Sequence, residues 1–241
     1  MNLILYTEDD IVDDGTVLLR DRRRDHIIGV LKCEKGDAVR VGLINGGMGQ
    51  GRIAGMTDGV VLEVSLDETL PPEPVIDLVL ALPRPIMLQR IFFQAAAMGV
   101  GRIFLINANR VEKSFFQASL LKEEKYRPFL VRGLEQAMDT RVPEVSVHKR
   151  FRPFVEDFLP AVARDYACRL VAHPGSAPLP PMDGDAAAGR VLLAVGPEGG
   201  WVDFEVEKFQ EQGFVPFGMG PRILRVDTAV VALMARVQLR L

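Results

Sequence analysis

The alternation of apolar, strand-length runs with helix-length segments constrains the fold of this chain more than any other feature of its sequence. It begins at residue 75, and most of the expected strands are continuous apolar runs. Such runs are typical of a parallel sheet that is covered by helices on both faces. The expected strands are 75–82, 102–107, 144–148, 168–172, 191–195 and 214–217, and the expected helices are 86–98, 120–138, 151–164, 203–212 and 226–239. The sequence therefore predicts an α/β domain here.

The segment before this domain has a different pattern of apolar runs and turns. Between Val39 and Leu66, short β-rich runs are separated by the glycine-rich stretch 45–51 and by an Asp-Gly pair, which predicts a small antiparallel barrel or meander. Because residues 45–51 lie between two strand-like runs, a hairpin turn is favoured over a nucleotide-binding loop. The proline-rich stretch 69–74 is typical of a stiff linker. We therefore expect one domain over residues 1–70 and a second over 73–241.

Composition and charge exclude several classes of function. The chain has 241 residues and a net charge of −3, from 29 basic and 32 acidic side chains, so any surface that binds nucleic acid must be local. The two cysteines and three histidines match no zinc spacing, which argues against a bound metal. No run is apolar and long enough to cross a membrane, and the N-terminal segment turns acidic too early for a signal peptide. A cytoplasmic protein without a membrane partner is expected.

Two glycine-rich loops are the strongest candidates for a functional site. The apolar run 191–195 leads into Gly-Pro-Glu-Gly-Gly-Trp at 196–201, and the run 214–217 leads into a loop that ends at Arg225. We expect the two strands to be neighbours, which would place both loops at the carboxyl edge of the sheet, where α/β proteins bind ligands. The first loop lacks the Lys-Ser/Thr of a phosphate-binding loop. Glu198 is unusual there, because a purely structural turn needs no acid.

Each of these features also has a plainer interpretation. The first loop is compatible with an ordinary strand-to-helix turn, and the arginines of the second with a solvated surface. His173, at the end of the expected strand 168–172, is compatible with a polar cap, and the basic cluster 20–24 with a solvated face. The stretch 174–189 is rich in proline, glycine and alanine and is interpreted as a surface loop.

The two loops together resemble the signatures of a known family. Gly-Pro-Glu-Gly-Gly-Trp at 196–201 and Met-Gly-Pro-Arg-Ile-Leu-Arg-Val-Asp-Thr-Ala at 219–229 are similar to the paired motifs of the ribosomal RNA small subunit methyltransferase E family, which belongs to the SPOUT class. Residues 24–32 with 35–37 resemble the family's N-terminal signature, and 97–100 and 133–137 fall where it has related elements. The resemblance thus extends over nearly the whole chain.

The resemblance implies a fold and an activity. It implies a SPOUT domain with a parallel sheet and a C-terminal trefoil knot, preceded by a PUA-like β-barrel that binds RNA. It also implies a homodimer that transfers a methyl group from S-adenosylmethionine to N3 of a uridine in 16S ribosomal RNA of the small ribosomal subunit, without a metal. The expected helix 226–239 is apolar on more than one face, which suits burial against the knot and a partner subunit or, alternatively, in the core of a monomer.

The resemblance also assigns residues to roles. Because an uncharged uracil N3 is a poor nucleophile, Glu198 is a candidate base or cofactor-orienting group, and Arg225 a candidate for stabilising the uridine anion. The implied cofactor-binding residues are His173, Gly196, Glu198, Gly199, Gly200, Met219, Gly220, Ile223, Leu224 and Arg225. The implied RNA-binding residues are Arg22, Arg23, Arg24, His26, Lys32 and Arg110, and further basic patches are expected around Arg141 with Lys149, Arg150 and Arg152, and around Arg222 with Arg225.

Several positions depart from the family pattern. The helix before Gly99 has Gln94 and Ala97 where the family has Lys and Glu, and the acid of the second motif is shortened to Asp227. Of the family's Glu-Arg-Ser only Arg110 is present. A subfamily with another uridine target, a ribosome-assembly factor that has lost transfer, and a nucleotide-binding hydrolase stay open as alternatives, although the hydrolase would need a phosphate loop or a Gly-x-Ser-x-Gly nucleophile that the sequence lacks.

Overall fold

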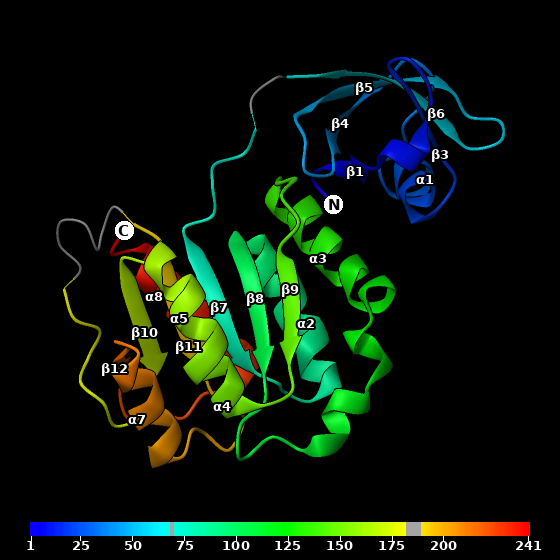
Figure 1. Ribbon diagram of the computed structural model, residues 1–241. Coiled ribbons are helices and arrows are strands. Elements are labelled where there is room, and N and C mark those ends of the chain that lie inside the picture. The colour runs from blue at the N-terminus through cyan, green and yellow to red at the C-terminus, as the bar shows by residue number, and fades with distance from the viewer. Residues whose placement is uncertain (68–69, 182–188) are drawn as a thin grey trace. The chain divides into compact units, whose positions relative to one another are not determined.

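The chain divides into two compact units (Figure 1). The computed structural model describes residues 1–67, 70–181 and 189–241. The first unit contains residues 1–72 together with 131–142, and the second contains 73–130 and 143–241. The sequence predicted one contiguous segment for each domain, so the addition of 131–142 to the first unit is a correction. It arises from long-range backbone hydrogen bonds, such as those from the Asn2 and Leu3 amides to the Glu135 carbonyl at 3.0 and 3.1 Å.

The first unit is built on one six-stranded sheet with the order β1-β4-β5-β6-β3-β2. Strands β4, β5 and β6 form the predicted antiparallel meander, β2 and β3 extend it, and β1 pairs with β4 in parallel. The strands are β1 (Ile4–Tyr6), β2 (Ile11–Asp13), β3 (Thr16–Leu19), β4 (Ala38–Leu43), β5 (Met48–Gly55) and β6 (Val60–Leu66), with helical turns η1 (Glu8–Asp10), α1 (Arg22–Asp25) and η2 (His26–Val30). One side of the sheet packs on a core that includes Val17, Leu19, Val41 and Leu62.

The glycine-rich stretch 45–51 is a hairpin, as predicted. Gly42 at the end of β4 lies opposite Met48 at the start of β5, and Asn45 between them has a φ of 60°. Asparagine tolerates this left-handed conformation better than most residues, which suits a tight connection. The nucleotide-loop alternative therefore has no support.

The second unit is the predicted α/β domain. Its six strands are all parallel and have the order β12-β10-β11-β7-β8-β9. The strands are β7 (Ile76–Ala81), β8 (Val100–Ile106), β9 (Glu144–His148), β10 (Cys168–Ala172), β11 (Val191–Val195) and β12 (Val215–Phe217). Its helices are α2 (Pro85–Ala97), α4 (Phe151–Pro153), α5 (Leu159–Val162), α7 (Asp203–Glu211) and α8 (Val226–Gln238), with the turns η3 (Lys113–Gln117), η4 (Ser119–Leu121), η5 (Phe154–Phe158) and η6 (Ala163–Asp165). Helix α3 (Glu123–Ala137) begins in this unit, and its residues from 131 onward belong to the first unit.

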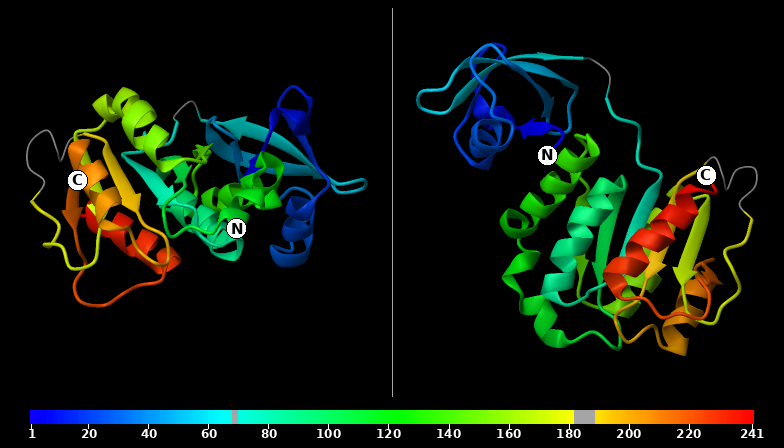
Figure 2. Two further views of the ribbon diagram at one scale, coloured as in Figure 1. Left: turned by 60° about the horizontal axis from the view of Figure 1, so that its bottom comes forward. Right: turned by 180° about the vertical axis from the view of Figure 1, so that it is seen from behind.

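Helices lie on both faces of this sheet. Helices α2 and α8 lie side by side on one face, and α5 lies on the opposite face (Figures 1 and 2). All residues of β7 and β11, the two central strands, are buried. Burial on both faces explains why these strands are apolar apart from Asp77 of β7.

Two details differ from the sequence prediction. The expected single helix 151–164 is a succession of short helical pieces, α4, η5, α5 and η6, and proline at positions 153 and 160 removes two backbone donors from this stretch. In the predicted surface loop 174–189, residues 182–188 lie outside the described residues. In the part of the chain that the structure describes, no helix is long and apolar enough to span a membrane.

The strand order corrects the expected position of the two glycine-rich loops. β10 lies between β11 and β12, so the two loops flank a third strand and do not end neighbouring strands. A periodicity shows that a segment is a strand but not which strand lies beside it, which is why the sequence could not give this order. The direction of chain progression reverses between β7 and β11, and such a reversal marks where ligands bind in open α/β sheets.

A buried polar cluster lies at the opposite, amino edge of the sheet. Asp77 of β7 has no exposed surface, and its carboxylate accepts hydrogen bonds from Arg102 Nε at 2.7 Å, Tyr166 Oη at 2.6 Å and Arg190 Nη2 at 2.7 Å. Burial, and then the hydrogen bond to Asp77 and the charge of that carboxylate, raise the pKa of the Tyr166 phenol above its ordinary value. The cluster connects β7 to β8 and to the segments that precede β10 and β11.

Candidate functional site

A cavity of about 350 Å³ opens at the carboxyl edge of the sheet, where β10, β11 and β12 end. It is formed by the loops that follow these three strands and by the start of α8. Its lining residues are Ala172, His173, Pro174, Val195, Gly196, Pro197, Glu198, Gly199, Gly200, Trp201, Phe217, Gly218, Met219, Gly220, Arg222, Ile223, Leu224, Val226, Ala229 and Leu233. Because β10 lies between the other two strands, its loop completes a three-sided site.

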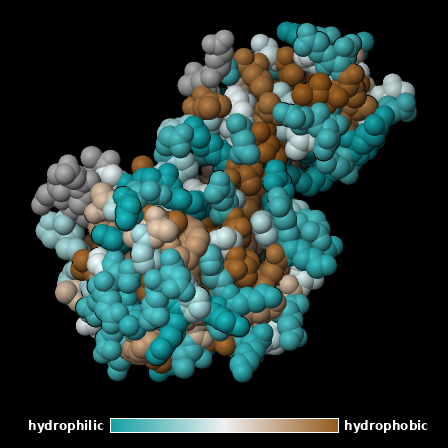
Figure 3. Space-filling view, viewed as in Figure 1, coloured by the Kyte–Doolittle hydropathy of each residue, from teal (hydrophilic) through white to brown (hydrophobic). Residues whose placement is uncertain are grey.

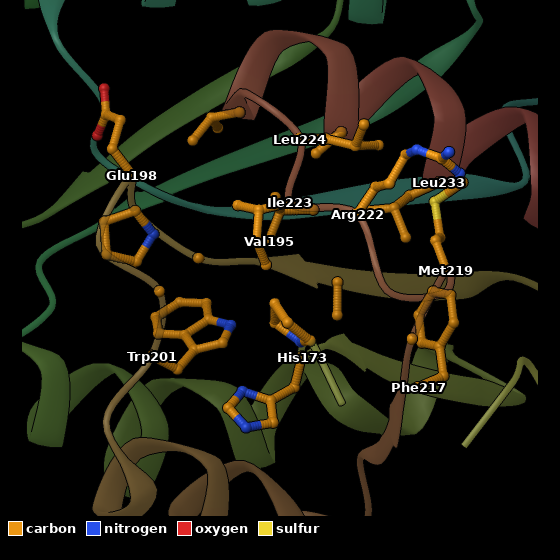
Figure 4. A pocket seen from close by; sticks show the side chains of 18 of the residues that line it. His173, Val195, Glu198, Trp201, Phe217, Met219, Arg222, Ile223, Leu224 and Leu233 are labelled. Carbon is orange, nitrogen blue, oxygen red and sulfur yellow. The ribbon is translucent and has the colours of Figure 1, made fainter. Parts of the chain in front are cut away.

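The wall of the cavity combines apolar side chains with two unpartnered donor or acceptor atoms. Val195, Ile223 and Leu224 lie on one side, and Trp201 and His173 lie below them (Figure 4). Trp201 Nε1 and His173 Nδ1 are buried and have no hydrogen-bond partner in the described structure. Buried polar atoms are normally paired, so these two atoms are available to a bound molecule.

The second glycine-rich loop lies very close to the loop after β10. The Gly218 amide donates a hydrogen bond to the Ala177 carbonyl at 2.8 Å, and a Cβ on Gly218 would lie only 2.8 Å from the Ser176 carbonyl oxygen. Only glycine fits without displacing that backbone. Gly220 has a φ of 108°, a conformation that side chains disfavour, and it is one of the lining residues.

Two side chains outside the cavity hold the first glycine-rich loop. Glu205 of α7 is 2% exposed, and its carboxylate accepts hydrogen bonds from the Val202 amide at 3.1 Å and the Asn109 amide at 2.7 Å. Arg110 donates from Nη1 to the Gly199 carbonyl. The loops after β8 and β11 are therefore joined, which limits how far residues 196–202 can move.

Glu205 was not among the residues predicted from the sequence. Its signal was present, because an acid three residues into a helix can accept from the amides at the start of that helix. The sequence could not show that the second carboxylate oxygen of Glu205 reaches the loop after β8, since 96 residues separate it from Asn109.

The structure brings together nine of the ten residues expected to bind a cofactor. His173, Gly196, Glu198, Gly199, Gly200, Met219, Gly220, Ile223 and Leu224 all line the cavity. Arg225, the tenth, is exposed at the N-terminus of α8 and is not a lining residue.

Glu198 lies at the rim of the cavity. Its carboxylate points away from the apolar wall, and Oε1 accepts a hydrogen bond from the Arg84 amide at 3.2 Å (Figure 4). The same bond ties the rim to the loop after β7. Of the two expected catalytic residues, therefore, Glu198 lines the cavity with its carboxylate turned away from the apolar wall, and Arg225 is not a lining residue.

The expected RNA-binding residues of the first unit fall into two groups. Arg22 forms a bidentate pair with Glu135, and Arg23 is bound by Asp10 and Asp21 with only 12% of its side chain exposed. Burial lowers the pKa of Arg23, but its hydrogen bonds to the two aspartates outweigh this effect and raise that pKa above its ordinary value.

The remaining three residues have fewer partners. Arg24 pairs with Asp25 at the surface, and Lys32 is exposed. His26 Nε2 is buried without a hydrogen-bond partner among the described residues. Throughout the described residues, no group of three or more His, Cys, Asp or Glu side chains is arranged to hold a metal ion.

Comparisons with known proteins agree with this geometry. Residues 71–238 match the model of a family described as RNA methyltransferase domain. A curated relative from Treponema pallidum, ribosomal RNA small subunit methyltransferase E, is 33% identical over 98% of this chain and 90% of its own length. A protein of the same name from Synechocystis is 27% identical over 93% of this chain and 73% of its own length.

A solved structure supports the fold. A ribosomal RNA small subunit methyltransferase E from Neisseria gonorrhoeae, bound to S-adenosylmethionine, superposes with a TM-score of 0.74 over 98% of this chain and 97% of its own. At 20% sequence identity this likeness establishes the fold alone.

Proposed function

The chain belongs to the ribosomal RNA small subunit methyltransferase E family of RNA methyltransferases, and on that premise we propose that it methylates N3 of a uridine in 16S ribosomal RNA, with S-adenosylmethionine as the methyl donor. The observation that carries the proposal is the cavity itself, which three strand-end loops build from both family motifs. We place the reaction in the cytoplasm, on the small ribosomal subunit.

The cavity suits S-adenosylmethionine in size and in chemistry. Its volume of about 350 Å³ is of the size that small-molecule sites in proteins have. The apolar wall formed by Val195, Ile223 and Leu224 suits an adenine ring, and the unpartnered Trp201 Nε1 is a donor for a ligand oxygen or ring nitrogen. The residues present therefore fit the cofactor, which supplies a methyl group on a positively charged sulfur.

The backbone of the two glycine-rich loops would hold the cofactor. The proposed backbone contacts are Gly196, Gly199, Gly200, Met219, Gly220, Ile223 and Leu224, and the proposed side-chain contacts are His173 and Glu198. Glycine lets the backbone approach a ligand closely, as the contact between Gly218 and Ser176 already shows within the protein.

Two charged side chains are proposed to act on the uridine. Loss of the N3 proton leaves a negative charge on the uracil, and Arg225 at the start of α8 would stabilise that charge. Glu198 at the rim would accept the proton or orient the cofactor. Because Arg225 makes no ion pair with any described residue, its guanidinium is free to turn toward a bound base.

The finer architecture of the family is part of the proposal. We assign a trefoil knot to the C-terminal part of the second unit and a PUA-like fold with an RNA-binding role to the first. In the first unit, Lys32 is exposed, and Arg22 and Arg24 keep 43% and 41% of their side chains exposed, so these three cations can reach a phosphate. Arg23 holds its segment in place through its ion pairs with Asp10 and Asp21. In the second unit Arg110 is the proposed contact.

A homodimer is also proposed. Near the cavity mouth and at the end of α8, large apolar side chains are exposed, including Ile223 at 74% and Leu239 at 86%. A second copy of the chain would cover them. Light scattering should give twice the chain mass of 26.6 kDa, and a monomer at micromolar concentration would contradict this part of the proposal.

The decisive experiment is methyl transfer to small ribosomal subunits that lack the native uridine modification. Labelled S-adenosylmethionine is supplied, the RNA is digested and its nucleosides are separated. We expect labelled 3-methyluridine. Label in another nucleoside would refute the proposed position and direct attention to Gln94 and Ala97, whereas cofactor binding without transfer would indicate an assembly factor.

An Arg225→Ala variant tests the proposed catalytic role. Removing one stabilising group from a developing anion typically costs about 100- to 1,000-fold in rate. The affinity for S-adenosylmethionine, measured by calorimetry, should change far less. A variant with the wild-type transfer rate would show that Arg225 has no part in the chemistry.

A further inference from the structure

Exposed basic side chains gather at the carboxyl edge of the sheet of the second unit, which is also the edge where the cavity lies. Lys149, Arg150 and Arg152 follow β9, and none of them makes an ion pair with any residue that the structure describes. Most of the face of the second unit that carries α4 and α7 is hydrophilic (Figure 3). The three cations belong to the segment 149–152, which is at the same edge of the sheet as the cavity because β9 runs parallel to the strands whose loops build it.

An exposed aromatic ring of α7 lies against this basic segment. Phe204, in the first turn of α7, is 38% exposed, and the Arg152 guanidinium carbon lies 4.9 Å from the centre of its ring. Lys208 lies on the same ring at 5.9 Å, but its charge is paired with Glu156 and Glu211. Arg152 is therefore the unneutralised cation of this group.

A chain of aromatic contacts connects Phe204 to the cavity. The Phe204 ring lies 6.4 Å from that of Phe151, which lies 6.5 Å from the ring of Trp201, a lining residue. Phe204 is thus two ring contacts from the site. This separation suits a nucleotide close to the reacting base and not the reacting base itself.

The combination has the chemistry of a site for single-stranded nucleic acid. Bases stack on exposed aromatic rings and on arginine guanidinium planes, while neighbouring basic side chains bind the phosphates between them. A buried aromatic would contribute to packing alone, and a cation held by carboxylates would have little charge left for a phosphate. Neither description fits Phe204 or Arg152.

We propose that Phe204 and Arg152 form a stacking platform for a nucleotide that flanks the methylated base, with Lys149 and Arg150 binding the adjoining phosphates. This inference rests on the proposed function, because it assumes that the substrate bound at the cavity is RNA. It assigns part of the recognition of the RNA sequence context to the second unit. Enzymes that act on nucleobases commonly read such flanking nucleotides.

The test uses fluorescence anisotropy to measure the affinity of the protein for a fluorescent single-stranded oligouridylate. The protein is saturated with S-adenosylmethionine throughout. Loss of one base–aromatic stack should raise the Kd of Phe204→Ala roughly 5- to 100-fold, whereas Phe204→Tyr keeps the ring and should bind like the wild type. Arg152→Ala should also weaken binding. The matched control is Arg164→Ala, which removes an exposed, unpaired arginine at the amino edge of the sheet.

The phosphate contacts have a signature of their own. Each phosphate contact contributes about 0.7 to the slope of log Kd against log salt concentration for single strands. Lys149→Ala and Arg150→Ala should each lower that slope by about this amount, whereas Phe204→Ala should leave it unchanged. The salt dependence of Kd therefore distinguishes a loss of base stacking from a loss of phosphate binding.

The outcomes also separate this inference from the proposed function. If Phe204→Ala and Arg152→Ala bind like the wild type, or if Arg164→Ala is weakened equally, the platform does not exist. The same holds if the wild type has no measurable affinity for the oligonucleotide. If the variants lose RNA affinity but the wild type transfers no methyl group to small subunits, the platform stands and the proposed reaction fails. Unfolding followed by Trp201 fluorescence confirms that the variants are folded.

Discussion

Replacing Asp77 with alanine should destabilise the second unit more than any surface substitution. The Asp77 carboxylate has no exposed surface and accepts hydrogen bonds from Arg102 Nε, the Arg102 amide, Tyr166 Oη and Arg190 Nη2, all within 2.8 Å. The substitution removes the acceptor that these three side chains share. The Arg190 guanidinium and the buried Tyr166 phenol lose this partner, and Arg102 keeps only its pair with the exposed Asp165.

The expected loss follows from what remains. Removing one partner of a buried ion pair typically costs about 3–5 kcal/mol, because the other partner stays buried and unpaired. Arg102 and Arg190 keep 25% and 31% of their side chains exposed, so water can solvate part of their charge. Tyr166 is only 4% exposed, and its unpaired hydroxyl adds about 1–3 kcal/mol. The partial solvation of the two arginines lowers the ion-pair loss and the unpaired hydroxyl offsets that reduction, so a net decrease of about 3–5 kcal/mol in the free energy of unfolding is expected.

The single tryptophan makes the assay specific. Trp201 lies in the second unit, so its fluorescence during urea titration reports the unfolding of that unit. Asp165→Ala is the matched control, since Asp165 also pairs with Arg102, at 3.2 Å, but its side chain is 52% exposed. An exposed pair of this kind contributes about 0–1 kcal/mol. If Asp77→Ala were destabilised no more than this control, the argument from buried unpaired charge would be refuted.

Three further predictions concern the same unit. Because the pKa of the Tyr166 phenol is raised in the folded protein, this phenol ionises in the unfolded chain first, above about pH 10. The free energy of unfolding should therefore fall as the pH rises through the alkaline range. The fall should be smaller for Tyr166→Phe in urea titrations at several pH values. Gly218→Ala places a Cβ 2.8 Å from the Ser176 carbonyl oxygen, and such overpacking typically costs about 1–3 kcal/mol. The displaced loop should bind S-adenosylmethionine more weakly in calorimetry. An unchanged Kd would show that the loop adapts without cost. Glu205→Ala removes the acceptor of the Asn109 and Val202 amides. The loss of these two hydrogen bonds should lower the free energy of unfolding by about 1–3 kcal/mol, whereas Glu205→Gln, which keeps one acceptor oxygen, should lose less in the same titration.

Much of the second unit could be predicted from local patterns. The predicted strands 144–148, 168–172 and 191–195 have the bounds that the structure gives to β9, β10 and β11. β11 is buried along its whole length and is therefore apolar throughout, while β9 alternates apolar and polar residues as a partly exposed strand does, so each signal is contained within its own segment. The hairpin at 45–51 was likewise local, since a short glycine-rich connection between two strand-like runs determines its own turn.

The candidate site was predictable for a similar reason. Nine of the ten expected cofactor-binding residues line the cavity, and they belong to two short motifs and to the end of one strand. The roles of the charged residues were less accessible to sequence reasoning. Arg23 was expected at an RNA surface, but Asp10 and Asp21 bind it, and such a pairing depends on the fold of the whole first unit.

What the sequence by itself determined was the class of the fold, the position of its strands and the residues around the cavity, because hydrophobic periodicity and glycine-rich turns act over a few neighbouring residues. Only the tertiary structure decided which elements meet. It places β10 between β11 and β12 and residues 131–142 in the first unit. It also brings two arginines and a tyrosine within hydrogen-bond distance of the Asp77 carboxylate. These contacts join residues far apart in the chain. Their free energy depends on burial and on paired charges that exist only when the elements have packed, and a local pattern cannot encode that pairing.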